Sequence, residues 1–143
     1  CCRTYGVGTI SKEAQYLIDV TKQAFFEGIK YATKNNRLGD ISHAIGQYVQ
    51  DNGLDVIREF EGHGIGREMH EEPGIPNYGK AGRGIRLEPG MTLAIEPMVV
   101  AGDRDICQGD DGWSIWTVDG SLSAHYENTI LITEKGPEIL TLL

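Results

Sequence analysis

The sequence predicts an α+β fold, in which two helices pack on an antiparallel sheet. Two amphipathic segments of helical length lie between residues 11 and 52. From residue 54 onward the chain contains short apolar runs, separated by glycine and proline. Helices followed by consecutive strands are typical of α+β proteins. With 143 residues, the chain has the length of one domain, which we expect over residues 1–143.

The first predicted helix covers Ser11 to Asn35 and begins at a serine that can cap it. Its apolar residues fall near one face at helical spacing, namely Ala14, Leu17, Ile18, Phe25, Ile29 and Ala32. The second helix runs from Asp40, which is also a good cap, to Asn52. Gly53 then occupies the position at which a left-handed residue commonly ends a helix.

Short strands are expected in the remainder of the chain. They cover Val56–Glu61, Met91–Val100, Trp113–Val118, His125–Thr133 and Glu138–Leu142. Asp119-Gly120 is typical of a hairpin turn and Gly136-Pro137 of a second turn. The segment Gly62–Gly90 contains too many glycines and prolines for a regular element, and long ordered loops are usually functional.

Charge and cysteine content exclude several classes of protein. The formal net charge is −8, which argues against nucleic acid or an anionic membrane as the main partner. No apolar run approaches the ~18 residues that a membrane helix needs, and no signal-peptide pattern is present. Cys1, Cys2 and Cys107 lack the spacing of a disulfide framework. We therefore expect free thiols and a cytoplasmic protein.

Glu96 lies inside the apolar run MTLAIEPMVV, which predicts that its carboxylate is buried. A buried carboxylate without a partner is costly, so either a Lys or Arg side chain or a metal ion should accompany it. Pro97 follows directly and favours a strand edge or bulge, where a side chain is often directed into a site.

Glu127 presents the same question in the segment SAHYENTILIT. On a strand it would share a face with His125, Thr129 and Leu131. A cross-strand ion pair is one explanation. Two half-buried glutamates and a histidine would alternatively form a nitrogen and oxygen ligand set suited to Mn, Fe, Co or Zn. Because no cysteine lies near these motifs, thiolate ligands are not expected.

Two histidines lie seven residues apart in GHGIGREMHEEPGIPNYG. Glycines flank His63 on both sides and permit close backbone approach, which suits a ligand more than a core histidine. His70 could act as a proton donor or stabilise an oxyanion. Glu71 and Glu72 are expected to be solvated loop acids, and a surface histidine remains the ordinary alternative for His63.

Over essentially the whole chain, the sequence closely resembles type I methionine aminopeptidases. The resemblance rests on GHGIGREMHEEPGIPNYG together with LEPGMTLAIEPMVVAG, DGWSIWTVDGSLSAHYENTILIT and the closing EILTL. The spacing of 31 residues between Glu96 and Glu127 resembles type I, because type II enzymes carry a long insertion there. Prolidases and aminopeptidase P share the fold but differ around the last glutamate. The resemblance implies the C-terminal half of a pita-bread fold (creatinase/aminopeptidase-like).

The resemblance also implies a dinuclear metal site with His63, Glu96 and Glu127 among its ligands. In the family that the chain resembles, two divalent ions (Co, Mn, Fe, Zn or Ni) share a bridging hydroxide that attacks the scissile carbonyl. The resemblance further implies that Glu96 shuttles the proton and that His70 contacts the scissile peptide, so both are expected to be catalytic. Met69 and Trp113 match positions that line or border the pocket for the substrate methionine.

The family also needs two aspartates from the N-terminal half of its fold, and alignment places the second immediately before Cys1. The resemblance therefore implies a partial domain with three of five ligands, at most one bound ion and no activity alone. The expected partners are the N-terminal methionine of nascent peptides, the missing half and the ribosome, with no direct nucleic acid and no membrane. Alternatives are an inactive pita-bread module that binds a peptide or partner, and a relative of prolidase or aminopeptidase P.

Overall fold

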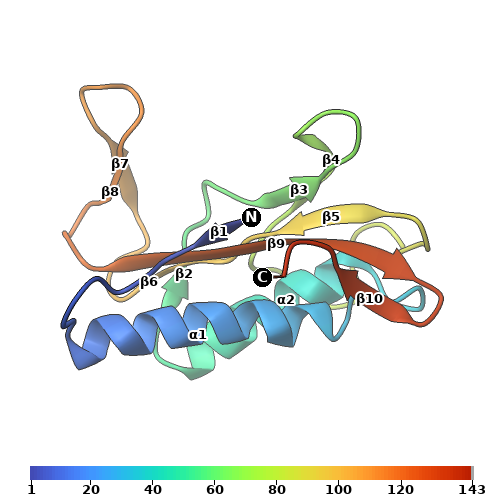
Figure 1. Ribbon diagram of the computed structural model, residues 1–143, viewed down its shortest axis with the longest axis horizontal. Coiled ribbons are helices and arrows are strands. Elements are labelled where there is room, and N and C mark those ends of the chain that lie inside the picture. The colour runs from blue at the N-terminus through green and yellow to red at the C-terminus, as the bar shows by residue number, and fades with distance from the viewer. Residues whose placement is uncertain (143) are drawn as a thin grey trace.

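The computed structural model describes residues 1–142, so Leu143 at the end of the expected domain lies outside them. Two helices, α1 (Lys12–Ile29) and α2 (Leu38–Asp51), lie against one face of an antiparallel sheet (Figure 1). The predicted α+β architecture is confirmed. Neither helix is long and apolar enough to cross a membrane, within the described residues.

The strands form one large sheet and one separate hairpin. Their bounds are β1 (Cys2–Arg3), β2 (Asp55–Val56), β3 (Gly62–Gly64), β4 (Glu71–Ile75), β5 (Thr92–Ile95), β6 (Met98–Val100), β7 (Ile106–Gln108), β8 (Ile115–Thr117), β9 (Ser123–Thr133) and β10 (Gly136–Ile139). The large sheet has the order β2-β6-β9-β5-β3-β4, and β1 and β10 also pair with β9. All these pairings are antiparallel, and within residues 1–142 β7 pairs only with β8.

The long strand β9 separates the core from the opposite face of the sheet. Its even-numbered side chains from Ala124 to Ile132 are buried, whereas the odd-numbered ones from His125 to Thr133 are half-buried. The rings of Phe25 and Phe26 in α1 pack on Tyr126, with centroids 5.4 and 6.1 Å away. The even-numbered face therefore meets the helices, and the odd-numbered residues point to the other side.

Helix α1 begins as predicted but ends earlier. Ser11 Oγ accepts a hydrogen bond from the backbone N–H of Ala14 at 3.1 Å. The helix stops at Ile29 and not at Asn35, because the N–H groups of Tyr31 and Ala32 bond carbonyls three residues back. These tighter turns end the α-helix while keeping Ala32 buried.

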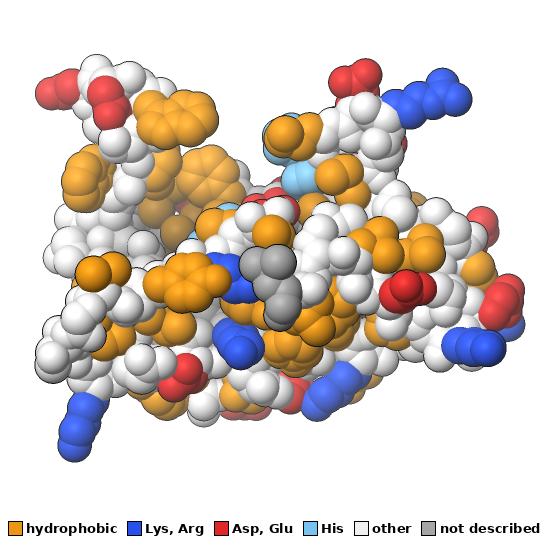
Figure 2. All heavy atoms as spheres, viewed as in Figure 1, with side chains coloured by type: hydrophobic (Ala, Val, Ile, Leu, Met, Phe, Trp, Pro, Cys, Tyr) orange, Lys and Arg blue, Asp and Glu red, His pale blue; other side chains and the backbone are white. Residues whose placement is uncertain are grey.

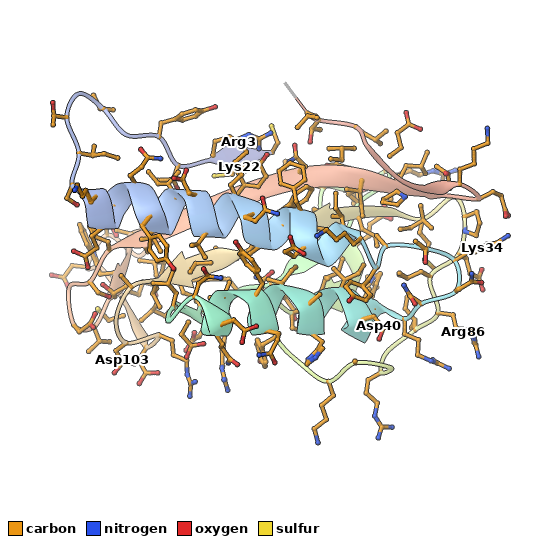
Figure 3. All side chains as sticks on the ribbon, turned by 90° about the horizontal axis from the view of Figure 1, so that it is seen from below. Arg3, Lys22, Lys34, Asp40, Arg86 and Asp103 are labelled. Atoms are coloured by element: carbon orange, nitrogen blue, oxygen red, sulfur yellow. The ribbon has the colours of Figure 1, made fainter. Side chains whose placement is uncertain are left out.

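Helix α2 begins at Leu38, so the prediction that Asp40 caps it is wrong. Asp40 lies in the first turn, where its carboxylate accepts the backbone N–H of Arg37 at 2.7 Å and that of Gly82 at 2.6 Å. Figure 3 shows Asp40 at this end of α2. At the other end Gly53 has φ 72°, as predicted for its position. The N–H of Gly53 bonds Gln50, and that of Leu54 bonds Val49, which closes the helix.

Two strand predictions fail around the glycine-rich segment. Of the predicted strand Val56–Glu61 only Val56 lies in a strand, β2, and the segment Gly62–Gly90 contains β3 and β4, although no regular element was expected there. A Cβ atom on Gly62 would lie 2.4 Å from the carbonyl oxygen of Ala94. Glycine is therefore required for the close pairing of β3 with β5. A glycine in such a strand and a glycine in a loop give the same sequence composition, so composition alone could not predict these strands.

Other strands differ mainly at their ends. Met91–Val100 is interrupted at Glu96 and Pro97 into β5 and β6, and the predicted strand Trp113–Val118 shortens to β8, whose partner β7 was not expected. Asp119-Gly120 is a turn between β8 and β9, which do not pair, so the hairpin prediction is wrong. The turn between β9 and β10 lies at Glu134 and Lys135, so the prediction of a turn at Gly136-Pro137 is wrong: these two residues begin β10, which ends at Ile139 and not at Leu142.

Candidate metal centre

The predicted site residues lie on the face of the sheet that points away from the helices. Two projections border this face, the β7–β8 hairpin and the hairpin formed by β3 and β4 (Figure 1). Figure 2 shows a hollow between them, with acidic and histidine side chains near its floor and apolar side chains on both projections. The exposed apolar residues include Met69, Trp113, Ile115, Trp116 and Val118.

Glu96 and Glu127 lie opposite each other across neighbouring strands. Ile95 of β5 pairs with Asn128 of β9, and Met98 of β6 pairs with His125 of β9. The register with β9 is therefore the same on both sides of the interruption at Glu96 and Pro97. Glu96 therefore faces Glu127, and opposed side chains lie on the same face of a sheet. Their side chains are 14% and 19% exposed. Like charges placed this way are destabilising without a cation.

The backbone around Glu96 is held on both sides. Pro97 interrupts the strand because it has no N–H to donate to a ladder. The carbonyl of Glu96 accepts a hydrogen bond from the buried amide of Asn77 at 3.1 Å, and the carbonyl of Pro97 accepts the N–H of Tyr126 at 3.2 Å. The predicted role of Pro97, which is to direct Glu96 into a site, agrees with this geometry.

His63 projects from β3 toward the same carboxylate. Its Nε2 lies 3.5 Å from Glu96 Oε1, and its Nδ1 lies 2.8 Å from the carbonyl oxygen of Gly64. Because a carbonyl can only accept, Nδ1 carries the proton in that bond. The neutral ring then presents an unprotonated Nε2 to the site, which is the usual arrangement of a metal-binding histidine.

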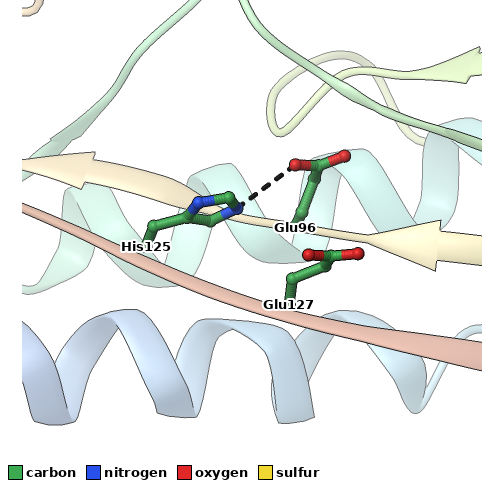
Figure 4. Close-up of side chains that lie close together, drawn as sticks. All are labelled: Glu96, His125 and Glu127. Carbon is green, nitrogen blue, oxygen red and sulfur yellow. Dashed lines mark ion pairs between the residues drawn. The ribbon is translucent and has the colours of Figure 1, made fainter. Parts of the chain in front are cut away.

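His125 is a further member of this group that was not predicted as a ligand. One ligand atom from each of Glu96, His125 and Glu127 lies within 4.8 Å of the others, whereas the predicted ligand His63 is not part of this group in the described residues, although its Nε2 lies near Glu96. Figure 4 shows the three side chains directed at the same space. His125 Nε2 lies 3.2 Å from Glu96 Oε2, but it is buried and has no hydrogen-bond partner. The alternation of side chains along a strand predicts from sequence that His125 shares a face with Glu127. Its closeness to Glu96 follows only from the register between β6 and β9.

No Lys or Arg side chain forms an ion pair with either glutamate among residues 1–142. The guanidinium of Arg3 lies over the ring of Tyr126, 4.3 Å from its centroid, and donates to the carbonyl of Glu127 and to Asn128 Oδ1. It therefore binds backbone and amide oxygens, and not the Glu127 carboxylate. That carboxylate lies 3.5 Å from the N-terminal amine of Cys1.

One expectation about cysteine is wrong. Strand β1 pairs with β9 so that Cys2 lies opposite Glu127, although no cysteine was expected near these motifs. The two residues are far apart in sequence, and only the pairing of the strands brings them together. Burial and the Glu127 carboxylate raise the pKa of the Cys2 thiol. The raised pKa favours the protonated thiol as long as no metal ion is bound.

The predicted substrate-binding residues are placed unequally. The ring of His70 lies beside that of His63, with centroids 4.4 Å apart, so His70 does reach the site. Met69 is 71% exposed on the adjoining loop, and Trp113 is 88% exposed near the tip of the β7–β8 hairpin. Neither side chain is enclosed in a pocket. Glu71 and Glu72 are exposed, as predicted, although both lie in β4.

The residues present fit a divalent cation. Two opposed carboxylates without a Lys or Arg partner supply negative charge, and the buried Nε2 of His125 lacks any hydrogen bond. The Nε2 of His63 is available because its Nδ1 is bonded to Gly64. Imidazole and carboxylate donors of this kind suit Mn, Fe, Co, Ni or Zn.

Comparison with known sequences gives a consistent result. The profile of metallopeptidase family M24 matches residues 1–134. Methionine aminopeptidase from Clostridium perfringens is 57% identical over 141 residues, which are 99% of this chain and 57% of that protein. Methionine aminopeptidase 1 from Bacillus subtilis is 49% identical over 138 residues, covering 96% of this chain and 56% of that protein. The chain thus spans slightly more than half the length of these curated relatives.

Solved structures agree with the sequence comparison. The crystal structure of methionine aminopeptidase from Thermotoga maritima matches with a TM-score of 0.96 and 51% identity, covering 99% of this chain and 57% of that one. Prolidase from Pyrococcus furiosus matches with a TM-score of 0.76 at 23% identity, covering 99% and 36%, which shows the fold alone. The predicted pita-bread architecture is confirmed by both likenesses.

Proposed function

The chain belongs to metallopeptidase family M24, and on this premise we propose that it carries the metal-holding part of a methionine aminopeptidase. The activity is hydrolytic removal of the initiator methionine from nascent polypeptides. The observation that carries the proposal is the opposed pair Glu96 and Glu127, flanked by imidazoles and without a Lys or Arg partner among residues 1–142. Identity of 57% to a methionine aminopeptidase supports the same choice.

In this proposal His63, Glu96 and Glu127 hold a divalent ion such as Co, Mn, Fe, Zn or Ni. When bound, the ion supplies a water of lowered pKa and polarises the scissile carbonyl. Glu96 accepts the proton of the attacking water and passes it to the leaving amine. The bond from Asn77 to the Glu96 carbonyl fixes the backbone that carries this carboxylate.

His70 contacts the scissile peptide and donates a hydrogen bond to the oxygen that becomes negatively charged in the transition state. Its ring lies beside that of His63, with centroids 4.4 Å apart, which supports contact with a carbonyl at the metal centre. Met69 and Trp113 border the pocket for the methionine side chain. Both are exposed in this chain, so we propose that a further segment of the protein completes the pocket.

The relatives are nearly twice as long as the region they share with this chain. We propose that an N-terminal segment supplies the two aspartates and the other face of the substrate pocket. Residues 1–143 then form a partial catalytic domain, which holds at most one ion and releases negligible methionine alone. The working protein is cytoplasmic and meets its substrates as they leave the ribosome, and the free cysteines agree with this location.

The test measures methionine release from a Met-Ala-type peptide with Mn²⁺ or Co²⁺ present. The chain is assayed alone and mixed with the part of the Clostridium perfringens relative that precedes the matched region. We expect negligible release by the chain alone and measurable release by the mixture, which Glu127→Gln abolishes. A mixture that assembles, binds metal and stays inactive toward this peptide contradicts the proposal and favours an inactive peptide-binding module. Cleavage of X-Pro peptides instead favours a prolidase-like enzyme.

A further inference from the structure

We propose that His125 is an additional ligand of the divalent ion, so that the centre offers two imidazoles to one metal. This inference rests on the metal centre of the proposed function but assigns a residue beyond the three named there. The ion would be bound by side chains from β3, from β9 and from the interruption between β5 and β6.

The strand geometry directs His125 into the centre. Residues two apart on a strand share a face, so His125 and Glu127 project together from β9. His125 pairs with Met98, which is two residues beyond Glu96, and this makes His125 the diagonal neighbour of Glu96. The ligand atoms of Glu96, His125 and Glu127 accordingly lie within 4.8 Å of one another.

The separations are those of ligands on one ion. Metal bonds to imidazole and carboxylate are about 2.0–2.2 Å long, so two tetrahedral ligands lie about 3.3–3.6 Å apart. His125 Nε2 is 3.2 Å from Glu96 Oε2, and His63 Nε2 is 3.5 Å from Glu96 Oε1. Each oxygen of the Glu96 carboxylate thus has one imidazole nitrogen near it, and each of these two pairs is separated by about the distance between two ligands of one ion.

A structural role for His125 fits less well. If the imidazole only oriented Glu96, its Nε2 should donate a hydrogen bond to the carboxylate. The atom is buried and has no hydrogen bond, despite lying 3.2 Å from Glu96 Oε2. Buried polar groups are nearly always paired, so a buried nitrogen that faces two carboxylates without a well-formed hydrogen bond suits a cation as their shared partner.

A second imidazole would change which metal the site prefers. Imidazole suits Zn²⁺, Co²⁺ and Ni²⁺, whereas carboxylate and water suit Mn²⁺ and Mg²⁺. His125 is therefore a residue that determines metal selectivity. Replacing it with glutamine keeps a polar side chain of similar reach and removes the imidazole.

The experiment uses the 143-residue chain, with His125→Gln as the variant and His43→Gln on helix α2 as the matched control. Calorimetric titration with Co²⁺, Zn²⁺ and Mn²⁺ gives the affinities, and circular dichroism verifies the fold. We expect His125→Gln to weaken Co²⁺ and Zn²⁺ binding by about 10- to 100-fold, on the scale of losses at metal-site residues, and Mn²⁺ binding far less. His43→Gln should bind all three ions as the unchanged chain does.

X-ray absorption of the Co²⁺-loaded unchanged chain provides a test that does not depend on how the variant folds. Two imidazoles on the ion are expected in the unchanged chain and one in His125→Gln. A single imidazole in the unchanged chain, or affinities that differ by less than twofold in the variant, overturns the assignment of His125 alone. Failure of the unchanged chain to bind any of the three ions contradicts the metal centre of the proposed function as well.

Discussion

Glu96 and Glu127 face each other across neighbouring antiparallel strands, on the side of the sheet that the helices leave open. Both side chains are more than four-fifths shielded from solvent, and no Lys or Arg pairs with them in the described part of the chain. Two carboxylates held this way repel each other unless a cation lies between them. The predictions below follow from this arrangement and from the elements that hold it.

Removing one carboxylate should have opposite effects with and without metal. With a chelator at pH 8, Glu96→Gln should leave the free energy of unfolding unchanged or raise it by about 0.2–1 kcal/mol, because like-charge repulsion is lost. At Co²⁺ concentrations about 100 times its dissociation constant, the unchanged chain should gain about 2.7 kcal/mol and the variant less than about 1 kcal/mol. Urea unfolding measures both.

Glu138→Gln is the control for that comparison, since Glu138 is exposed on β10 and belongs to no cluster. It should respond to Co²⁺ as the unchanged chain does. Equal stabilisation of Glu96→Gln and Glu138→Gln by the ion would contradict a role for Glu96 in binding it.

The close pairing of β3 with β5 should be needed to place His63. A Cβ on Gly62 would lie 2.4 Å from the backbone oxygen of Ala94, so Gly62→Ala should cost about 1–3 kcal/mol of stability and weaken metal binding. Gly74→Ala is the matched control, because its Cβ would meet only the end of the Glu61 side chain, which can move. Thermal unfolding and Co²⁺ titration of both variants provide the measurement. Equal losses in the two variants would refute the steric explanation.

The carboxylate of Asp40 in the first turn of helix α2 should make a pH-dependent contribution to stability. The backbone N–H groups of Arg37 and Gly82 hold the pKa of Asp40 below its usual range. A group whose pKa is lowered by folding stabilises the protein above its unfolded pKa, about 3.9, and loses that effect as the pH falls through the lowered value. Asp40→Ala should therefore cost about 1 kcal/mol near neutral pH and progressively less below about pH 4.

The control for Asp40→Ala is Asp51→Ala at the other end of the same helix, where a negative charge is unfavourable to the helix dipole. Asp51→Ala should not destabilise the protein. A stability difference between Asp40→Ala and the unchanged chain that stays constant from pH 7 to pH 3 would show that the carboxylate charge is not responsible.

The two histidines of the glycine-rich segment should separate metal binding from catalysis. In the mixture that releases methionine, His70→Asn should lower kcat by about 10²–10³-fold, as expected for the loss of a donor to the oxyanion, and leave Co²⁺ affinity unchanged. His63→Asn should lower the Co²⁺ affinity itself. Titration and steady-state kinetics on the same samples distinguish these results, and a loss of metal binding in His70→Asn would contradict its assignment.

The helices, the strand β9 and the choice of Glu96 and Glu127 as candidate ligands could be predicted from sequence because each depends on local pattern, whereas their opposition follows from the register of β5 and β6 with β9. A carboxylate inside an apolar run must have a partner, whatever the fold. The role of His125 could not be predicted, because its closeness to Glu96 depends on the register between β6 and β9. Similarly, the glycines that allow β3 to approach β5 cannot be distinguished by composition from glycines in a loop. The end of α1 was also predicted too late, because Ala32 is buried although the α-helix has already ended.

The most direct test of the central claim is the anomalous diffraction of a crystal of the 143-residue chain grown with Co²⁺. We predict one strong peak between the carboxylates of Glu96 and Glu127, within bonding distance of the Nε2 atom of His63. The claim is contradicted if no peak lies there, or if a Lys or Arg side chain occupies the space between the two glutamates.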